Sequence, residues 1–447
     1  MTIRVSIVVG SMLGLSMIGL GQADAADLLQ PASVQQVTYE LDNSLYFTAE
    51  GESPSDASIM DKGACDGCGA CDACAPKCCP AAPGITIGGW MAMGYTANGF
   101  NAQNPPAGGG NGPVTFNYRA NDFQLNQLNL FMERATETGG NGWDLGGRID
   151  LLFGEDYIFT QAAGLETRPN WDNAWNVGVG GAGIGGTGRY GLAMPQFYGE
   201  VAYNDLKVKV GHFYTIIGYE VVSAPSNFFY SHSYTMQYGE PFTHTGAIAT
   251  WEYAERLTLI AGIVNGWDKF DAVNDRGSFV GGFSWTSPSE RASLALSFIT
   301  GEEDGAVAIL GNRTMYSLVF SLDVTDDWQY VLQHDLGVQE NGIAAGQDAG
   351  WYGLNQYLFY TLSDTWAAGF RYEFFIDQNG TRVTNVPGDW QEFAVGLNWS
   401  PNDYMVLRPE LRWDRFNPSG AGAAAGPFND ATDRDQFLFG IDLILTL

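Results

Sequence analysis

The chain has 447 residues, of which 45% are hydrophobic and 13% aromatic, and its 58 glycines are many for a soluble helical enzyme. The 21 Lys and Arg residues against 50 Asp and Glu residues give a net charge of -29 at pH 7. Such a charge excludes nucleic acid as a partner, because binding DNA or RNA depends on neutralising phosphates. The composition is typical of strand-rich proteins with many tight turns.

The first residues predict an export signal. Arg4 gives a positive start, residues 5–20 form an apolar stretch, and an A-x-A cleavage site ends at Ala25. We therefore expect residues 1–25 to be a signal peptide. Residues 26–83 are polar and contain all six cysteines, and no periodicity is visible in them. We expect this segment to be a flexible Cys-rich periplasmic extension.

The cysteines are the most conspicuous local feature of that extension: Cys65, Cys68, Cys71, Cys74, Cys78 and Cys79. The spacing from Cys68 to Cys78 resembles an iron–sulfur ligand run. Such clusters are loaded in the cytosol, however, and this chain is expected to leave the cytosol unfolded. Soft metals such as Zn²⁺ or Cu⁺ fit the ligand chemistry, whereas disulfides fit the oxidising compartment. We expect disulfides within or between chains, with metal binding left open, and we expect no cofactor.

From residue 84 to the C-terminus, apolar and polar residues alternate with a period of two, as in half-buried strands. Near the end of the chain, Phe437, Phe439 and Ile441 alternate with Gln436 and Asp442. No segment after the leader has 18 uninterrupted apolar residues, which excludes transmembrane helices. We predict about sixteen strands, within a range of 14–18: 84–96, 123–134, 141–153, 194–203, 205–213, 243–254, 256–265, 277–286, 291–300, 313–323, 327–338, 351–362, 365–376, 390–399, 403–414 and 435–447.

The connections between these predicted strands alternate in length. Those after even-numbered strands are few-residue turns, and those after odd-numbered strands are long, including residues 339–350. Barrels of the bacterial outer membrane have this asymmetry, with short periplasmic turns and long external loops. Because an open sheet edge cannot lie in hydrocarbon, the strands must close. We therefore predict an all-β fold, a transmembrane antiparallel up-and-down β-barrel over residues 84–447.

Tryptophans gather at both ends of the predicted strands. Six lie beside short turns, namely Trp143, Trp251, Trp285, Trp328, Trp366 and Trp399, and four lie near long connections, namely Trp267, Trp351, Trp390 and Trp413. Indole rings with one wet edge favour membrane interfaces. We expect two belts at the two membrane surfaces, the alternative being aromatic capping of a soluble sheet.

Longer motifs support a family resemblance. Residues 197–271 include VAYNDLKVKVGHFYTIIGYEVV, FFYSHSYTMQYGEPFTHTG and AGIVNGWDKFD, and residues 351–361 read WYGLNQYLFYT. These motifs resemble the β-barrel porin family abundant in planctomycete bacteria, and the resemblance covers nearly all of residues 84–447. It implies an outer-membrane barrel similar to the general porins.

Charged residues on the polar faces of the predicted strands are expected to line the lumen: Arg148, Asp150, Glu200, Lys207, Lys209, Arg371, Glu373, Arg408, Glu410, Arg412 and Asp414. Opposed basic and acidic walls would create a transverse field that tunes selectivity for size and charge. The alternative is that these residues pair as structural salt bridges in a plugged barrel. A charge is costly on the lipid side but not inside.

The third long connection, residues 214–242, is the predicted constriction. It contains several polar and aromatic candidates, with the last at its end: Glu220, His232, Tyr234, Tyr238, Glu240 and His244. In general porins the third loop folds into the barrel, and we expect the same here. An ordinary surface loop or a trimer contact is the alternative.

Together these features predict an outer-membrane porin, a water-filled channel for passive diffusion of small hydrophilic solutes and ions. The alternative is a structural barrel that is cross-linked to other envelope proteins through its cysteines. A barrel enzyme would need a catalytic constellation at the external rim, where His232 and Ser233 are candidates by residue type only. No catalytic motif occurs, so we expect no enzyme. The expected partners are outer-membrane lipid and small solutes, and the sequence leaves monomer and homotrimer open.

Overall fold

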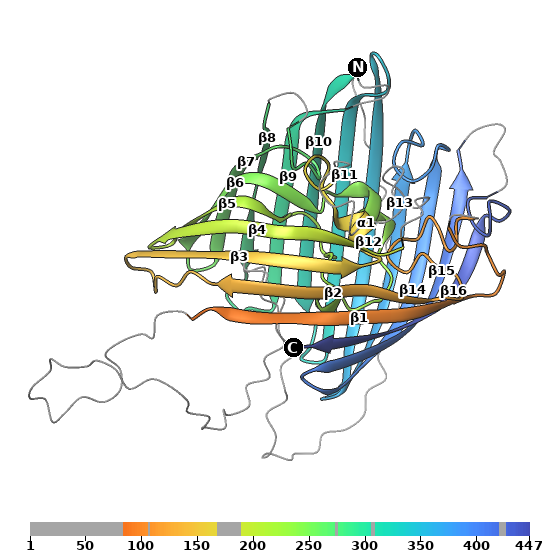
Figure 1. The fold of residues 1–447 in the computed structure, drawn as a ribbon, viewed down its shortest axis with the longest axis horizontal. Helices are drawn as coiled ribbons and strands as arrows, with labels where there is room; N and C mark the ends of the chain where they lie inside the picture. Colours follow the sequence, from red (N-terminus) through yellow and green to blue (C-terminus); the bar gives the residue numbers. More distant parts are fainter. Residues whose placement is uncertain (1–83, 106–107, 168–188, 273–275, 305–308, 420–425) are drawn as a thin grey trace, which may run out of the picture. The chain divides into compact units, whose positions relative to one another are not determined.

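The computed structural model describes residues 84–105, 108–167, 189–272, 276–304, 309–419 and 426–447. These residues form one antiparallel sheet of sixteen strands, in which consecutive strands pair with each other. The first strand also pairs with the last, so the sheet closes into a barrel (Figure 1). The predicted all-β barrel is confirmed. The predicted leader, the extension and the cysteines lie outside the described residues.

The strands agree with the predicted segments to within a few residues at most ends. They are β1 (Thr86–Asn98), β2 (Phe123–Arg134), β3 (Trp143–Gly154), β4 (Gly191–Tyr203), β5 (Leu206–Tyr214), β6 (Thr243–Ala254), β7 (Leu257–Val264), β8 (Ser278–Thr286), β9 (Ala292–Asp304), β10 (Leu310–Asp323), β11 (Trp328–Ala344), β12 (Gln347–Ser363), β13 (Trp366–Asp377), β14 (Gly388–Asn402), β15 (Met405–Pro418) and β16 (Asp435–Thr446). The described parts of the connections contain three short helical turns: α1 (Tyr157–Thr160), Ala224–Ser226 and Thr235–Gly239. None of the helices in the described residues is long and apolar enough to span a membrane.

The period-two alternation decides which side chains face outward. In β16, Phe437 and Phe439 are 54% and 41% exposed, whereas Leu438 between them is 1% exposed. In β5, Val210 is exposed on the outside while the neighbouring Lys209 faces inward. Large apolar side chains thus cover the outer surface, which is the arrangement of a barrel whose solvent is lipid.

Tryptophans divide differently between the two ends of the barrel. Those beside the short turns face outward, as predicted, and Trp143, Trp251 and Trp366 are exposed. At the other end, Trp351 and Trp390 are fully buried inside the barrel. The prediction that these two belong to a belt at the membrane surface is wrong. Each lies in phase with the inward-facing residues of a strand that begins earlier than predicted, at Gln347 for β12 and at Gly388 for β14.

Trp267 is also buried, in the connection between β7 and β8. It packs with the loops inside the barrel and takes no part in a surface belt. Trp413, in β15, lies against the outward Phe393 of β14, with ring centroids 5.7 Å apart.

One predicted long connection is a tight hairpin. Strands β11 and β12 continue toward each other until only residues 345–346 separate them. Gly346 adopts a φ of +73°, a conformation that suits a two-residue turn between strands of right-handed twist. The prediction of a long connection over residues 339–350 is therefore wrong. The alternation simply continues beyond the segment that we assigned to the bilayer.

The described parts of five longer connections meet inside the barrel. We name them L1 (residues 99–122), L3 (residues 215–242), L4 (residues 265–277), L7 (residues 378–387) and L8 (residues 419–434). One apolar cluster joins five loop residues to inward-facing residues of the wall: Val114, Ile217, Tyr234, Trp267 and Phe428 from the loops, and, among others, Ile248, Val264, Val280, Ile299 and Met315 from β6 to β10. This packing positions L3 within the barrel.

Candidate functional site

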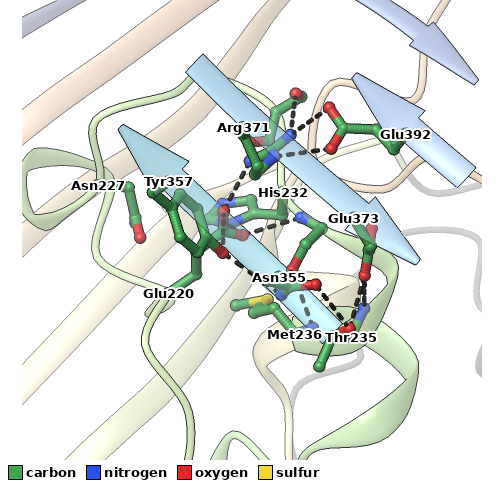
Figure 2. Close-up of polar contacts among 12 residues, drawn as sticks. Glu220, Asn227, His232, Thr235, Met236, Asn355, Tyr357, Arg371, Glu373 and Glu392 are labelled. Carbon is green, nitrogen blue, oxygen red and sulfur yellow. Dashed lines mark hydrogen bonds and ion pairs between the residues drawn. The ribbon is translucent and has the colours of Figure 1, made fainter. Parts of the chain in front are cut away.

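Loop L3 lies in the interior of the barrel, and polar contacts fix it to the wall. Figure 2 shows residues of L3 facing the inward side chains of β12, β13 and β14. Glu220, His232, Tyr234 and Glu240 of this loop are each at most 6% exposed. A loop with so many buried polar groups must satisfy them inside the protein, and the wall supplies the partners.

Arg371 of β13 is the centre of these contacts (Figure 2). Its Nη1 donates to Glu220 Oε1 at 2.6 Å and to the Ser231 carbonyl at 2.8 Å. Its Nη2 donates to Ser231 Oγ at 2.9 Å and to Glu392 Oε1 at 3.1 Å, and its Nε donates to Glu392 Oε2 at 2.9 Å. The guanidinium therefore bridges L3 to β14, and its planar fork suits two carboxylates at once.

Further wall charges hold the backbone of L3. Arg408 donates to the carbonyls of Ala224 and Asn227 at 3.0 and 2.5 Å, while its other nitrogens pair with Asp442. Arg412 donates to the carbonyl of His232 at 2.6 Å. Arginines of the wall thus hold carbonyl groups of the loop.

Carboxylates of the wall hold backbone N–H groups of L3 in the same way. Glu410 accepts from the N–H groups of Tyr230 and Ser231, and Glu373 accepts from those of Tyr234 and Thr235 at 2.7 and 2.6 Å. The opposite charges of the wall therefore match the opposite ends of the loop's peptide dipoles. Such charge-assisted hydrogen bonds are strong where water is excluded.

Glycines of the wall make room for aromatic side chains of L3. A Cβ at Gly369 of β13 would lie 2.3 Å from Phe228 Cε1, and a Cβ at Gly94 of β1 would lie 2.4 Å from Tyr230 Cζ. Gly353 of β12 leaves similar space for Thr235. The loop approaches the wall so closely that only glycine fits at these positions. These glycines were not among the predicted site residues, although glycine at inward positions of alternating strands is a visible signal.

L3 also borders a small internal cavity on the side of β1 to β3. The cavity has a volume of about 60 Å³, enough for a few water molecules. Its lining includes Trp90, Arg148, Tyr214, Glu220 and Met236. The described part of L3 is therefore packed closely on the β12–β16 side and less closely here.

Burial and neighbouring charges shift the ionisation of three groups of L3. Burial alone would raise the pKa of Glu220, but the charge of Arg371 and contacts with His232 hold it below its ordinary value. Burial lowers the pKa of His232. Burial and the adjacent Asp335 of β11 raise the pKa of Glu240 well above its ordinary value. Glu220 is thus an anion bound to the wall, whereas Glu240 favours its neutral form.

The remaining L3 candidates also have wall or loop partners. The Tyr234 hydroxyl donates to Asp414 at 2.8 Å, and the Tyr238 hydroxyl donates to the Pro113 carbonyl at 2.6 Å. His244, the second residue of β6, lies 2.9 Å from Thr215 Oγ1 and 3.0 Å from the Gly266 carbonyl through its two ring nitrogens. All six candidates therefore lie inside the barrel, and His244 belongs to a strand.

The eleven candidates for the lumen wall all face inward, in two groups. Eight are buried and take part in hydrogen bonds or ion pairs: Arg148, Asp150, Arg371, Glu373, Arg408, Glu410, Arg412 and Asp414. The other three, Glu200, Lys207 and Lys209, lie on β4 and β5 and are partly exposed. The eight buried residues thus favour structural pairing, and the three partly exposed residues favour pore lining.

The family of the chain follows from its sequence profile. Residues 84–447 match the family described as "Putative beta-barrel porin-2, OmpL-like", which spans the whole barrel. No curated protein sequence matches the chain. Solved structures with a similar fold include the anion-selective porin from Comamonas acidovorans, with a TM-score of 0.55 and 10% identity over 81% of this chain and 99% of that chain. The outer membrane channel DcaP of Acinetobacter baumannii is also similar, with a TM-score of 0.53 and 8% identity over 81% and 97% of the two chains.

At these identities the solved structures establish the fold alone, and the match over the full barrel establishes the family. The sixteen-stranded closed barrel, the apolar outer surface and the inward third loop agree with it. The chain therefore belongs to this family of outer-membrane β-barrel porins.

Proposed function

We propose that the barrel is a water-filled channel through which small hydrophilic solutes and ions diffuse passively, with L3 as its constriction. The observation that carries this proposal is the contrast between two parts of the inner wall. Beneath L3, the charged wall of β13 to β15 is buried against the loop. On β4 and β5, by contrast, Glu200, Lys207 and Lys209 face inward and stay partly exposed.

Partly exposed charges on the inner wall need water beside them. A lysine with neither water nor a partner would cost several kcal/mol in a low-dielectric interior. Lys207 lies next to the short-turn end of β5, where it pairs in register with Ala202 of β4. Because Lys207 is partly exposed near this end, we infer that water enters the barrel beside β5. This supports an aqueous passage that L3 narrows nearer the other end of the barrel.

The proposal is tested by single-channel recording on protein refolded into planar bilayers. We expect discrete conductance steps in KCl, and a lysine exposed to the passage should influence ion selectivity. Lys207→Glu should shift the reversal potential in a salt gradient toward cation preference. Arg291→Glu, the same change of charge at an exposed position before β9, is the matched control and should leave it nearly unchanged. A correctly folded barrel without conductance steps would overturn the proposal.

Three finer points belong to the same proposal. We infer that the barrel performs no covalent chemistry and that its solutes pass unmodified. The sequence motifs favour a planctomycete origin, and a homotrimer in the outer membrane is the assembly that we would test first. Migration of unheated protein in mild detergent, with and without reductant, distinguishes a trimer held by barrel contacts from one held by disulfides.

A further inference from the structure

Two arginines inside the barrel differ from all the paired arginines of the wall. Arg313 lies on β10 and Arg382 lies in L7, and both are partly exposed. Arg148, Arg371, Arg408 and Arg412 each lie within 3.0 Å of a carboxylate oxygen. Neither Arg313 nor Arg382 has an ion pair with a carboxylate within 4.0 Å in the described part of the chain.

Each of these two guanidinium groups uses a single nitrogen for a protein contact. Arg313 Nε donates to Gln339 Oε1 at 2.5 Å, and Arg382 Nε donates to the carbonyl of Tyr238 in L3 at 2.5 Å. The described residues offer no further acceptor to either group. Because guanidinium has five N–H donors and no acceptor, the terminal nitrogens of both arginines are available to a ligand.

Tryptophan rings hold the two guanidinium groups in place. The Cζ atoms of Arg313 and Arg382 lie 5.0 and 4.9 Å from the ring centre of Trp267. Arg382 also lies 4.6 Å from the ring centre of Trp351, whose ring packs edge-on against Trp267 at 5.9 Å. A guanidinium group over a ring face keeps its terminal N–H groups free for an oxyanion, which it can bind in a bidentate manner.

The carboxylates near this pair already have other partners. Asp268 Oδ1 accepts from the N–H groups of Phe242 and Thr243, and Glu303 Oε1 accepts from the N–H of Trp267. Asp377 accepts from three successive N–H groups of L7. These acids reduce the local positive potential, but they make no direct contact with the guanidinium groups.

The nearby carboxylates do not fully compensate the positive charge of Arg382. Burial and the nearby charge of Arg313 lower the pKa of Arg382 to about 9, against the opposing effect of Asp377 and its neighbours. An arginine with a lowered pKa gains stability from any anion that approaches it.

We propose that Arg313 and Arg382, which both lie over the ring of Trp267, form a binding site for a small oxyanion, a phosphate or carboxylate group, beside L3. The site lies where L3, L4 and L7 meet β10 to β12. Trp267 of L4 lies against both arginines, and Arg382 of L7 donates to the Tyr238 carbonyl of L3. Trp351 of β12 donates through Nε1 to the carbonyl of Gly239 near the end of L3. This inference rests on the proposed channel function and adds to it a class of solute. A solute with an anionic group would bind here next to the constriction.

The test measures binding and conduction separately. Isothermal titration calorimetry of the refolded barrel with sodium phosphate, and in a second series with sodium acetate, measures binding without a channel. Conductance in KCl with added phosphate or acetate at constant ionic strength measures block of the open channel. The two series distinguish a preference for phosphate from a preference for carboxylate.

We expect phosphate or acetate to bind the native barrel and to reduce its open-channel current. Loss of one charge-assisted contact should weaken binding about tenfold in Arg313→Gln or Arg382→Gln, and the double variant should lose it. Arg382→Lys, which keeps the charge but not the planar fork, should be intermediate. Arg276→Gln is the matched control, because Arg276 is exposed and pairs with Glu302 at the same end of the barrel.

Three results would overturn the inference. One is equal affinity in the native barrel and the folded double variant, another is an equal loss in Arg276→Gln, and the third is the absence of binding to the native barrel. If the barrel binds the anion but never conducts, the channel function fails and the binding site stands. If it conducts in KCl but binds neither anion, the site fails and the channel function stands.

Discussion

Replacing Arg371 by Gln should release L3 from the wall. All five donors of this guanidinium are used, by Glu220, Glu392 and two oxygens of Ser231. Removing one partner of a buried ion pair costs about 3–5 kcal/mol, because the remaining charges lose their compensation. Here the remaining charges are two carboxylates, one in the loop and one in the wall. Because detachment of L3 exposes Glu220 to water, we expect the loop to detach before the barrel unfolds.

A cost of about 4 kcal/mol corresponds to a shift of roughly a thousandfold in the equilibrium between bound and detached L3. Limited proteolysis with chymotrypsin measures this shift, because L3 contains Phe228, Phe229 and Tyr230, and cleavage follows the population of the open form when opening is fast. We expect cleavage within L3 to accelerate by about two to three orders of magnitude in the folded variant.

Arg148→Gln is the matched control for this experiment. Arg148 is equally buried and ion-paired, but its partners Glu133 and Asp150 both belong to the wall. It should lower the stability of the barrel without exposing L3. If L3 stays protected in Arg371→Gln, or loses protection to the same degree in both variants, then the Arg371 contacts do not hold the loop.

Three further predictions concern the fit of L3, its pH dependence and the N-terminal extension. Gly369→Ala places a Cβ against Phe228 and should destabilise the barrel by about 1–3 kcal/mol in thermal unfolding. Gly199→Ala is the control, because no atom lies within 4 Å of the new Cβ, and it should not destabilise the barrel. Equal effects of the two substitutions would contradict the close fit of L3. Because the pKa of Glu240 is raised, the contribution of Glu240 to holding L3 against the wall is complete below about pH 4.5, and it is lost as the pH rises through the raised pKa. Protease protection of L3 should therefore fall with rising pH in the native barrel, and Glu240→Gln should remove that dependence; an unchanged profile would show that another group titrates. Deleting residues 26–83 behind the leader should leave folding and conductance intact, and a barrel that fails to fold would place part of its stability in the extension.

The strand pattern was predictable because the alternation of residues within each strand is enough to assign its inward and outward faces. Phe437 and Leu438 differ in exposure through alternation alone, and alternation can be read from the sequence. The inward direction of the charged wall residues was predictable for the same reason, since Arg371 and Arg412 lie on the polar face of their strands. The strand ends were less predictable, because the hairpin at Gly346 and the burial of Trp351 both depend on strands that continue beyond the expected span.

The contacts that fix L3 were not predictable, because they join residues far apart in the chain. Nothing in the sequence around Arg371 indicates that its partner is Glu220, or that Gly369 makes room for Phe228. The arginines at Trp267 were missed for a related reason. A strand position such as Arg313 reveals that the side chain faces inward, but not that the nearby carboxylates of Asp268 and Glu303 bind backbone N–H groups and leave its guanidinium group without an ion pair.

The closure of the sheet by β1 and β16 also constrains how the barrel can assemble. Trp90 pairs in register with Thr446, so the final seam joins the two ends of the described chain. Neighbouring hairpins can form in sequence with small loop-closure entropies, but the seam has the longest sequence separation in the sheet. Until it forms, two strand edges offer unpaired N–H and C=O groups to other chains. Aggregation during refolding should therefore be sensitive to the terminal strands, and an insertion factor that covers these edges would act at this last step.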